Sequence, residues 1–300
     1  DLYFKVLGCG MDPRKAQNLK PGAAKKTLWA NCGASQFHLP KGEVGQKIPG
    51  HIGLRVTSLA DLKERLQTGK EHCESFHEGN DSRTGRPHIY IQDHYGNAFI
   101  CREPHQQTQS KSASLQQPFI KPSDSHWGAI ATEYGREQTE CLGIDYVEFS
   151  CRPQQAERIA MFYEALLDAT TNVVSLDATG QQKAAVIGVG NIDETGKAEQ
   201  SLLFRETSDP IPEYDGHHIA LYVGESAQDF EQAFKNALLA NVVWKNPRFS
   251  DQVDNLEEAR KEQQFRFKEI IDIETGVPIM ELEHEMRSIN HPSWPGDKQG

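Results

Sequence analysis

The sequence lacks several patterns that define large classes of proteins. It has no long apolar run, since stretches such as 183–189 and 236–244 are far shorter than the ~20 apolar residues that span a bilayer, so we expect no membrane span. Basic residues are in the minority: 32 Lys and Arg stand against 43 Asp and Glu, and the 300-residue chain has a formal charge of −11. Nucleic acid and anionic membranes are bound by basic surfaces, so neither is an expected partner.

The cysteines form no pattern typical of a zinc knot or a disulfide-rich scaffold. They are dispersed, and no two have CxxC spacing. The six are Cys9, Cys32, Cys73, Cys101, Cys141 and Cys151. We expect reduced thiols in a soluble protein of a reducing compartment, either the cytoplasm or an organelle stroma. The printed chain begins with Asp1 in what reads as the middle of an element, so we expect a trimmed N-terminus whose targeting peptide is not visible.

Length and composition predict two domains. Residues 105–125 contain five Gln, five Ser and two Pro, a composition that buries little apolar area and is typical of a linker. We expect an N-terminal module over 1–103, a Gln/Ser-rich linker over 104–142, a C-terminal module over 143–286 and an extended tail over 287–300.

An internal repeat is the most informative pattern. Residues 50–56 (GHIGLRV) and 217–223 (HHIALYV) share the pattern H-I-[GA]-L-x-V, and each is followed by Ser-x-x-Asp, at 58–61 and 226–229. Alternation of apolar residues predicts a strand. A serine followed three residues later by an aspartate predicts a helix start. Each copy is therefore a strand that leads into a helix.

Two more segments have related patterns. Residues 144–149 alternate as a strand and lead into 154–168, where the apolar residues share one helical face. Residues 2–8 (LYFKVLG) match 161–167 (MFYEALL) and represent the end of a helix. β-rich stretches follow each helix, at 26–39, 88–102, 184–189 with 201–206, and 265–283. We predict an α+β fold with four βαβββ units, the first one truncated.

The order of these motifs resembles the vicinal oxygen chelate superfamily, which includes glyoxalase I, bleomycin-resistance proteins and extradiol dioxygenases. The resemblance rests on HIGLRV (51–56), NCGASQFHL (31–39), DHYGNAF (93–99), MFYEALL (161–167), HIALYV (218–223) and ETG through MEL (274–282). It implies that the units pair into two modules with curved mixed sheets around a cavity. It also implies a divalent metal ion (Fe, Mn, Zn or Ni) bound by residues at the starts and ends of strands.

In the C-terminal module the resemblance implies a metal site formed by Asp145, His218 and Glu281. Nitrogen and oxygen ligands suit such an ion and leave room for a substrate oxygen. The family's oxygenases usually have a second histidine where Asp145 stands. A lyase or isomerase acting on a small substrate with vicinal oxygens is therefore favoured over a dioxygenase. One extra residue between Gly276 and Glu281 leaves the register open by one, and His217 is an alternative to His218.

The N-terminal module has a poorer set of ligands. His51 is in the ligand position and His38 stands where glyoxalases have a glutamate, but Ile100 occupies the place expected for a carboxylate. We expect no metal in this module. A general base for the reaction would be an extra carboxylate such as Glu148 or Glu206, and the sequence leaves this choice open.

Structural roles compete with metal binding for the same residues. His51 and His218 can be hydrogen-bonded to backbone at the starts of strands, and Asp145 can cap a turn. The glutamates of residues 281–285 can form a charged strand face, because alternation puts all three on one side. The incomplete ligand sets, the linker and the tail favour an alternative function, a non-catalytic ligand-binding protein or structural subunit of a larger assembly. Its partners would be a small ligand, another protein or a second copy of the chain.

Overall fold

The computed structural model describes residues 1–19, 22–23, 27–33, 35–81, 84–104, 139–192 and 198–293. The chain divides into two bodies. The first body comprises Asp1–Glu148 and Asp193–Gln200, and the second comprises Phe149–Ile192 and Ser201–Gly300. Most of the predicted linker over 104–142 lies outside the described residues, so the predicted module boundaries stay a prediction.

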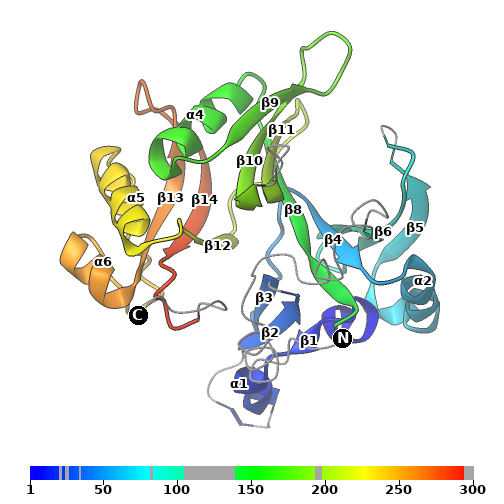
Figure 1. Ribbon diagram of the computed structural model, residues 1–300. Helices are drawn as coiled ribbons and strands as arrows, with labels where there is room; N and C mark the ends of the chain where they lie inside the picture. Colours follow the sequence, from blue (N-terminus) through cyan, green and yellow to red (C-terminus); the bar gives the residue numbers. More distant parts are fainter. Residues whose placement is uncertain are drawn as a thin grey trace. The chain divides into compact units, whose positions relative to one another are not determined.

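The first body contains the elements drawn from blue to cyan in Figure 1 and most of one green strand, β8. They are η1 (Leu2–Val6), β1 (Gly10–Met11), α1 (Pro13–Ala16), η2 (Gln17–Leu19), β2 (Thr27–Cys32), β3 (Ser35–Pro40), β4 (Gly50–Val56), α2 (Leu59–Thr68), η3 (Lys70–His72), β5 (Ser75–Asn80), β6 (Pro87–Gln92), β7 (Ala98–Arg102) and the larger part of β8 (Cys141–Cys151).

The second body begins within β8 and continues to the C-terminal strand. Its elements are α4 (Ala156–Leu167), β9 (Thr171–Ser175), β10 (Lys183–Ile192), most of β11 (Ala198–Glu206), β12 (His218–Tyr222), α5 (Ala227–Leu239), α6 (Leu256–Glu262), β13 (Gln264–Ile271) and β14 (Pro278–Arg287). Beyond β14, the start of the predicted tail is packed against this body, because Ser288 and Ile289 are buried.

The βαβββ units share one strand order, in which the first strand lies beside the last. In the first body the order is β5-β6-β7-β4, with β4 parallel to β7. The strand order β9-β10-β11-β8 repeats it. The final unit has β13-β14-β12, with β12 parallel to β14 and one isolated bridge, Val243–Phe267, in place of a further strand. The N-terminal unit contains η1 and the sheet β1-β2-β3. The predicted α+β fold with curved mixed sheets is confirmed.

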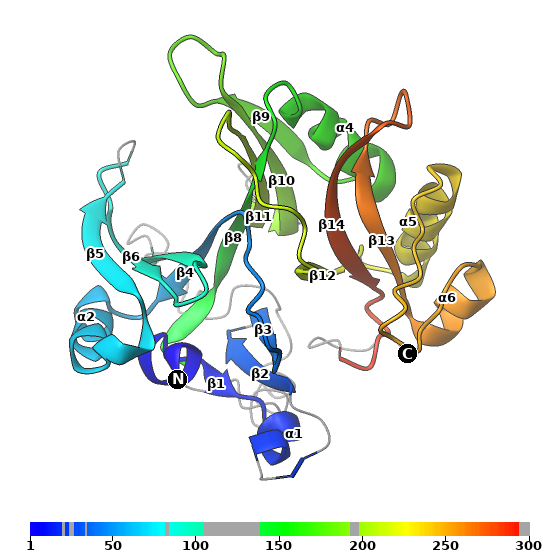
Figure 2. The ribbon, with the colours of Figure 1, turned by 180° about the vertical axis from the view of Figure 1, so that it is seen from behind.

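The strands bury one face against the helices of their own body. In β4, Ile52, Leu54 and Val56 are buried beside α2 residues Leu62 and Leu66. In the second body, both views show α5 and α6 on the same side of β13 and β14 (Figures 1 and 2). That side holds a core of aromatic rings from helices and strands: Phe162, Tyr163, Phe230, Phe234, Phe265 and Phe267. Burial of such rings is the main apolar contribution to the stability of this body.

None of the helices in the described part of the chain combines the length and the apolar character that crossing a membrane requires.

Candidate functional site

The sheet β12-β14-β13 of the second body has one charged face. Side chains alternate along a strand, so residues 281, 283, 285 and 287 of β14 lie on the side opposite the aromatic core, as the alternation of the glutamates predicts. We call the following set the charged face: His218 of β12, Arg266 and Lys268 of β13, and Glu281, Glu283, Glu285 and Arg287 of β14.

Glu283 lies at the centre of the charged face and is fully buried. The Asn246 Nδ2 donates to both of its oxygens, at 2.8 and 2.9 Å. Arg266 donates to Oε1 at 3.0 Å and Arg248 to Oε2 at 3.0 Å. The Tyr214 hydroxyl adds a longer contact of 3.5 Å to Oε2. Two cations and an amide therefore occupy the oxygens of this carboxylate.

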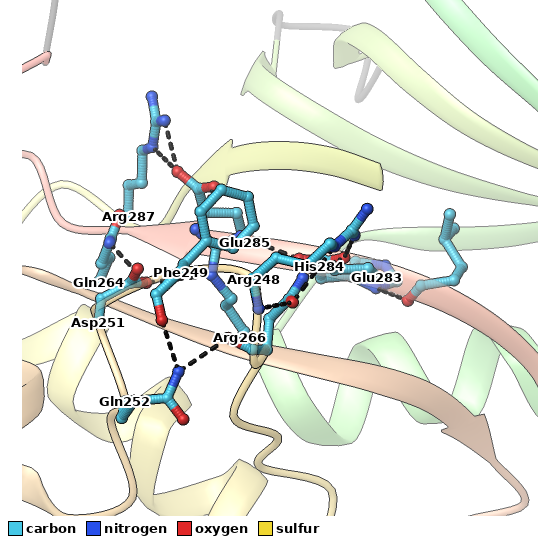
Figure 3. Close-up of polar contacts among 12 residues, drawn as sticks. Arg248, Phe249, Asp251, Gln252, Gln264, Arg266, Glu283, His284, Glu285 and Arg287 are labelled. Carbon is cyan, nitrogen blue, oxygen red and sulfur yellow. Dashed lines mark hydrogen bonds and ion pairs between the residues drawn. The ribbon is translucent and has the colours of Figure 1, made fainter. Parts of the chain in front are cut away.

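Arg266 connects three carboxylates and is itself only 4% exposed (Figure 3). Besides Glu283, its guanidinium contacts Glu285 at 2.6 Å and Asp251 at 3.1 Å. The ring of Phe249 stacks over it, with 4.2 Å between the guanidinium carbon and the ring centroid. This arginine has a fixed position, because its Nε, Nη1 and Nη2 atoms each contact a carboxylate.

Glu285 has cations on both oxygens. Arg287 donates to Oε1 at 2.6 Å and Arg266 contacts Oε2. Burial by itself would raise the pKa of Glu285, but the charges of Arg287 and Arg266 outweigh it and hold this pKa at about 2. The carboxylate is thus charged at any physiological pH.

His218 lies beside Glu283 in the parallel pairing of β12 and β14. Burial lowers the pKa of His218, and the neighbouring Arg266 and Arg248 act in the same direction against the opposite effect of Glu283 and Glu285. At neutral pH this histidine is therefore an uncharged nitrogen donor.

The other two predicted ligands have cationic partners. Glu281 is 44% exposed and forms an ion pair with Lys268. Asp145 belongs to the first body and forms an ion pair with Arg55. Of the three, only His218 and Glu281 are in the same sheet, so the set Asp145, His218 and Glu281 stays a prediction. The carboxylate paired with His218 in the strand register is Glu283, two residues along from Glu281 on the same face.

His217, the alternative to His218, has a different environment. It is buried, and its Nδ1 is 2.8 Å from a carboxylate oxygen of Asp215. Its ring stacks near Phe149, and its Nε2 is buried with no hydrogen-bond partner within the described residues. The carboxylate fixes the orientation of the ring, but the described residues supply no second ligand beside Nε2.

The two candidate bases have different roles. Glu206 is buried and accepts from the backbone N–H of Ala156 at 3.0 Å and of Lys183 at 3.2 Å, so its carboxylate satisfies the start of α4. Glu148, in the first body, contacts His51 instead, with 3.1 Å between Glu148 Oε1 and His51 Nδ1. Of the two, Glu148 is therefore the one in contact with a histidine.

His51 is in contact at both ring nitrogens. Its Nε2 is 2.9 Å from the Tyr146 hydroxyl, and its Nδ1 faces the buried carboxylate of Glu148. Because a carboxylate only accepts, the proton belongs on Nδ1, and the Tyr146 hydroxyl then donates to Nε2. Tyr146 can approach because β4 has Gly53 here, where any Cβ would lie 2.1 Å from its ring. Tyr146, His51 and Glu148 thus form a hydrogen-bonded chain across β4 and β8.

Comparison with models of protein families gives no match to this chain, and comparison with curated proteins gives none. Solved structures do match. Glyoxalase I from Zea mays is 11% identical, with 96% of this chain and 86% of that chain covered and a TM-score of 0.52. A "putative dioxygenase" from Bacillus subtilis is 15% identical, with 96% and 79% covered and a TM-score of 0.51. The chain has the vicinal oxygen chelate fold. The resemblance based on the motifs is confirmed for the fold.

The vicinal oxygen chelate fold raises the question whether the second body suits a divalent metal. Among the described residues, no group of three or more His, Cys, Asp or Glu side chains is arranged to hold one. On the charged face, the donor set explains why: both oxygens of Glu283 and Glu285 accept from arginines, and Glu281 is paired with Lys268. The residues present do not fit a divalent ion.

Sequence reasoning missed Arg266, Arg248 and Tyr146. Arg266 had a recognisable signal, because in FRFKE (265–269) the charged residues alternate with phenylalanines and must share the face of the glutamates. Arg248 lies in a loop, and the contact of Tyr146 with His51 depends on which strand neighbours β4 in this vicinal oxygen chelate fold. Neither residue therefore had a local signal in the sequence.

Proposed function

We propose that this protein is an enzyme of the lyase or isomerase type that transfers a proton on a small substrate with vicinal oxygens, with Tyr146, His51 and Glu148 as its acid–base group. The observation that carries the proposal is the contact of His51 at both ring nitrogens, to a phenol and to a buried carboxylate. A reactive group, a base and a residue that orients the base form the arrangement that activates a hydroxyl for proton transfer.

The roles follow from the hydrogen bonds. Tyr146 is half-buried and would contact the substrate. When its oxygen takes a proton from carbon next to a carbonyl group, its own proton passes to His51 Nε2. Glu148, with a side chain only 7% exposed, then stabilises the imidazolium through Nδ1–H. The relay returns the proton to the neighbouring carbon or oxygen and regenerates the starting state.

No step of this proposal passes through a metal, because the carboxylates of the predicted ligand set Asp145, His218 and Glu281 both hold cationic partners. The resemblance and the fold suggest a glyoxalase-type activity on a substrate with vicinal oxygens. This suggestion guides the choice of compounds to test.

The experiment measures exchange of the C–H proton next to the carbonyl, followed by proton NMR in D2O. The panel contains small α-hydroxy ketones, dicarbonyls and their thiol adducts. We expect the full-length protein to accelerate exchange for at least one compound. The Tyr146→Phe variant should lose about 100-fold or more of that rate, the usual contribution of a general acid or base. His51→Gln should lose a similar factor.

A matched control is available in the same body. Tyr90 also lies against a histidine, stacked on His77 with 4.8 Å between ring centroids, but it has no part in the relay. Tyr90→Phe should therefore keep the wild-type rate. Equal rates for the wild type and a folded Tyr146→Phe variant would contradict the proposal.

The second candidate is the non-catalytic ligand-binding or structural subunit. It is favoured by one observation, the complete pairing of the buried carboxylates on the charged face. Absence of exchange with every compound, together with co-purification of a stable partner, would support this candidate over the enzyme.

A further inference from the structure

The charged face contains side chains of the types that bind divalent metal ions. His218 supplies an imidazole nitrogen, and Glu283 is its partner on the neighbouring parallel strand. Glu285 follows two residues later on the same face and is also buried. Imidazole nitrogen suits Zn, Fe and Ni, and carboxylate oxygens suit Mn. These types of side chain suit a metal ion. Metal binding therefore depends on whether the carboxylates are already paired with positive charge.

The positive charge that these carboxylates require is already present. Glu283 and Glu285 together accept from three arginines, Arg248, Arg266 and Arg287, at distances between 2.6 and 3.0 Å. Asn246 occupies both oxygens of Glu283 in addition. A metal ion would have to displace charge-assisted hydrogen bonds in a buried environment, where breaking one partner of a pair is costly.

Arg266 has a fixed position in the sheet. It belongs to β13, directly opposite Glu285 in the register with β14, and its backbone carbonyl accepts from the Trp244 N–H at 2.8 Å. Phe249 covers its guanidinium on one side (Figure 3). Arg248, in contrast, comes from the loop between α5 and α6, and its side chain is 53% exposed. The two arginines thus reach Glu283 from a rigid strand and from a surface loop.

We propose that the guanidinium groups of Arg266 and Arg248 take the place of a divalent cation on the charged face, so that the second body binds no divalent metal although it has side chains of the types that bind one. The ion pairs form a structural centre that holds the loop of residues 244–254 against the sheet. Removing the two positive charges leaves Glu283 without a cation and Glu285 with Arg287 alone, beside His218, and creates a metal site. All of these residues lie in the second body, so this inference is independent of the function proposed for Tyr146 and His51.

The test measures binding of Mn²⁺ to the full-length protein by electron paramagnetic resonance, with Zn²⁺ and Ni²⁺ followed by calorimetry. In the wild type, Glu283→Gln and His218→Ala should leave the number of bound ions unchanged. The variant Arg248→Met/Arg266→Met should gain about one ion per chain, and adding Glu283→Gln to it should remove that ion. The control Arg260→Met, on α6, breaks an exposed ion pair with Glu231 of α5 and should gain none.

Folding of each variant is checked by circular dichroism. If the double variant does not fold, Arg248→Met decides, because its exposed side chain can be shortened with little effect on the core. It should bind Mn²⁺ at least tenfold more tightly than the wild type. The inference is overturned if the wild type binds an ion that Glu283→Gln or His218→Ala removes. A folded arginine variant that gains no ion overturns it as well.

Discussion

At position 284 a buried histidine is held in its uncharged form by its neighbours. Its Nδ1 is 2.7 Å from the carbonyl oxygen of Leu282, and its Nε2 is 2.6 Å from the hydroxyl of Tyr163. The ring stacks on Phe267 with 4.1 Å between centroids. Burial lowers the pKa of His284 to about 3, against the opposite effect of the backbone hydrogen bond. A proton on Nε2 would end the hydrogen bond that Tyr163 donates there.

This environment predicts a loss of stability in mild acid. The folded pKa of about 3 lies below the ordinary value near 6.5, so between these values the unfolded chain binds one more proton. The contribution of His284 is complete above pH 6.5 and is lost as the pH falls toward 3. At pH 5 the free energy of unfolding should be about 2 kcal/mol lower than at pH 7 from this residue alone.

Urea unfolding at pH 7 and pH 5 measures the effect. His284→Gln is the comparison, because glutamine does not titrate and can still accept from Tyr163. The wild type should lose about 2 kcal/mol more than the variant over this interval. Identical pH dependence of the two proteins would show that His284 is not the group responsible.

At the scale of single elements, helix α5 begins with a complete capping box. Ser226 accepts from the Asp229 N–H at 3.3 Å, and the Asp229 carboxylate accepts from the N–H groups of Ser226 and Glu225, each at 2.9 Å. The preceding Gly224 has φ +66°, and a Cβ there would lie 2.1 Å from Asp229. The tight turn therefore requires glycine, and it brings the backbone donors to the carboxylate.

We expect Asp229→Ala to lower the free energy of unfolding by about 1 kcal/mol, the usual value of a cap. Asp61→Ala in α2 is the matched control. There Ser58 accepts from the Asp61 N–H, and within the described part of the chain the reciprocal bond from the Asp61 side chain is absent. Its cost should be nearer about 0.5 kcal/mol, the effect of a negative charge near a helix start. Equal costs in chemical denaturation would contradict the role of the reciprocal bond.

At the scale of the whole molecule, every cysteine is a buried free thiol. Five of them belong to the core of the first body, and Cys151 belongs to the second. Three meet near the start of β8, where hydrogen bonds from Cys32 and Cys9 lower the pKa of Cys141. The same clustering and burial hold the pKa of Cys9 and Cys32 above the ordinary range. Three of the dispersed cysteines of the sequence thus meet in space without forming disulfides.

Burial of all six thiols predicts their reactivity. Ellman's reagent should modify none of them within minutes in the native protein, because a bulky disulfide cannot reach sulfur atoms in a packed core. All six should react after unfolding in guanidinium chloride. Rapid modification of one thiol in the native protein would show that part of a core opens on that timescale. The Cys141→Ser variant would then show whether Cys141, with its lowered pKa, is the thiol that reacts.

The sequence by itself determined the features that depend on neighbours along the chain. Alternation predicted β4 and β12, the Ser-x-x-Asp pattern predicted the starts of α2 and α5, and the order of elements predicted the βαβββ units. These signals are local, because a strand or a helix face is defined by residues two to four positions apart. The common face of the glutamates of β14 followed for the same reason.

Only the tertiary structure decided which side chains meet across strands. Tyr146 and His51 are 95 residues apart, and their contact depends on β4 and β8 coming together. The pairing of His218 with Glu283 depends on the register of β12 against β14, and Arg266 reaches Glu283 and Glu285 through the register of β13. A shift of register by two residues keeps every apolar side chain on its own face but exchanges the polar partners, so the hydrophobic pattern cannot specify them.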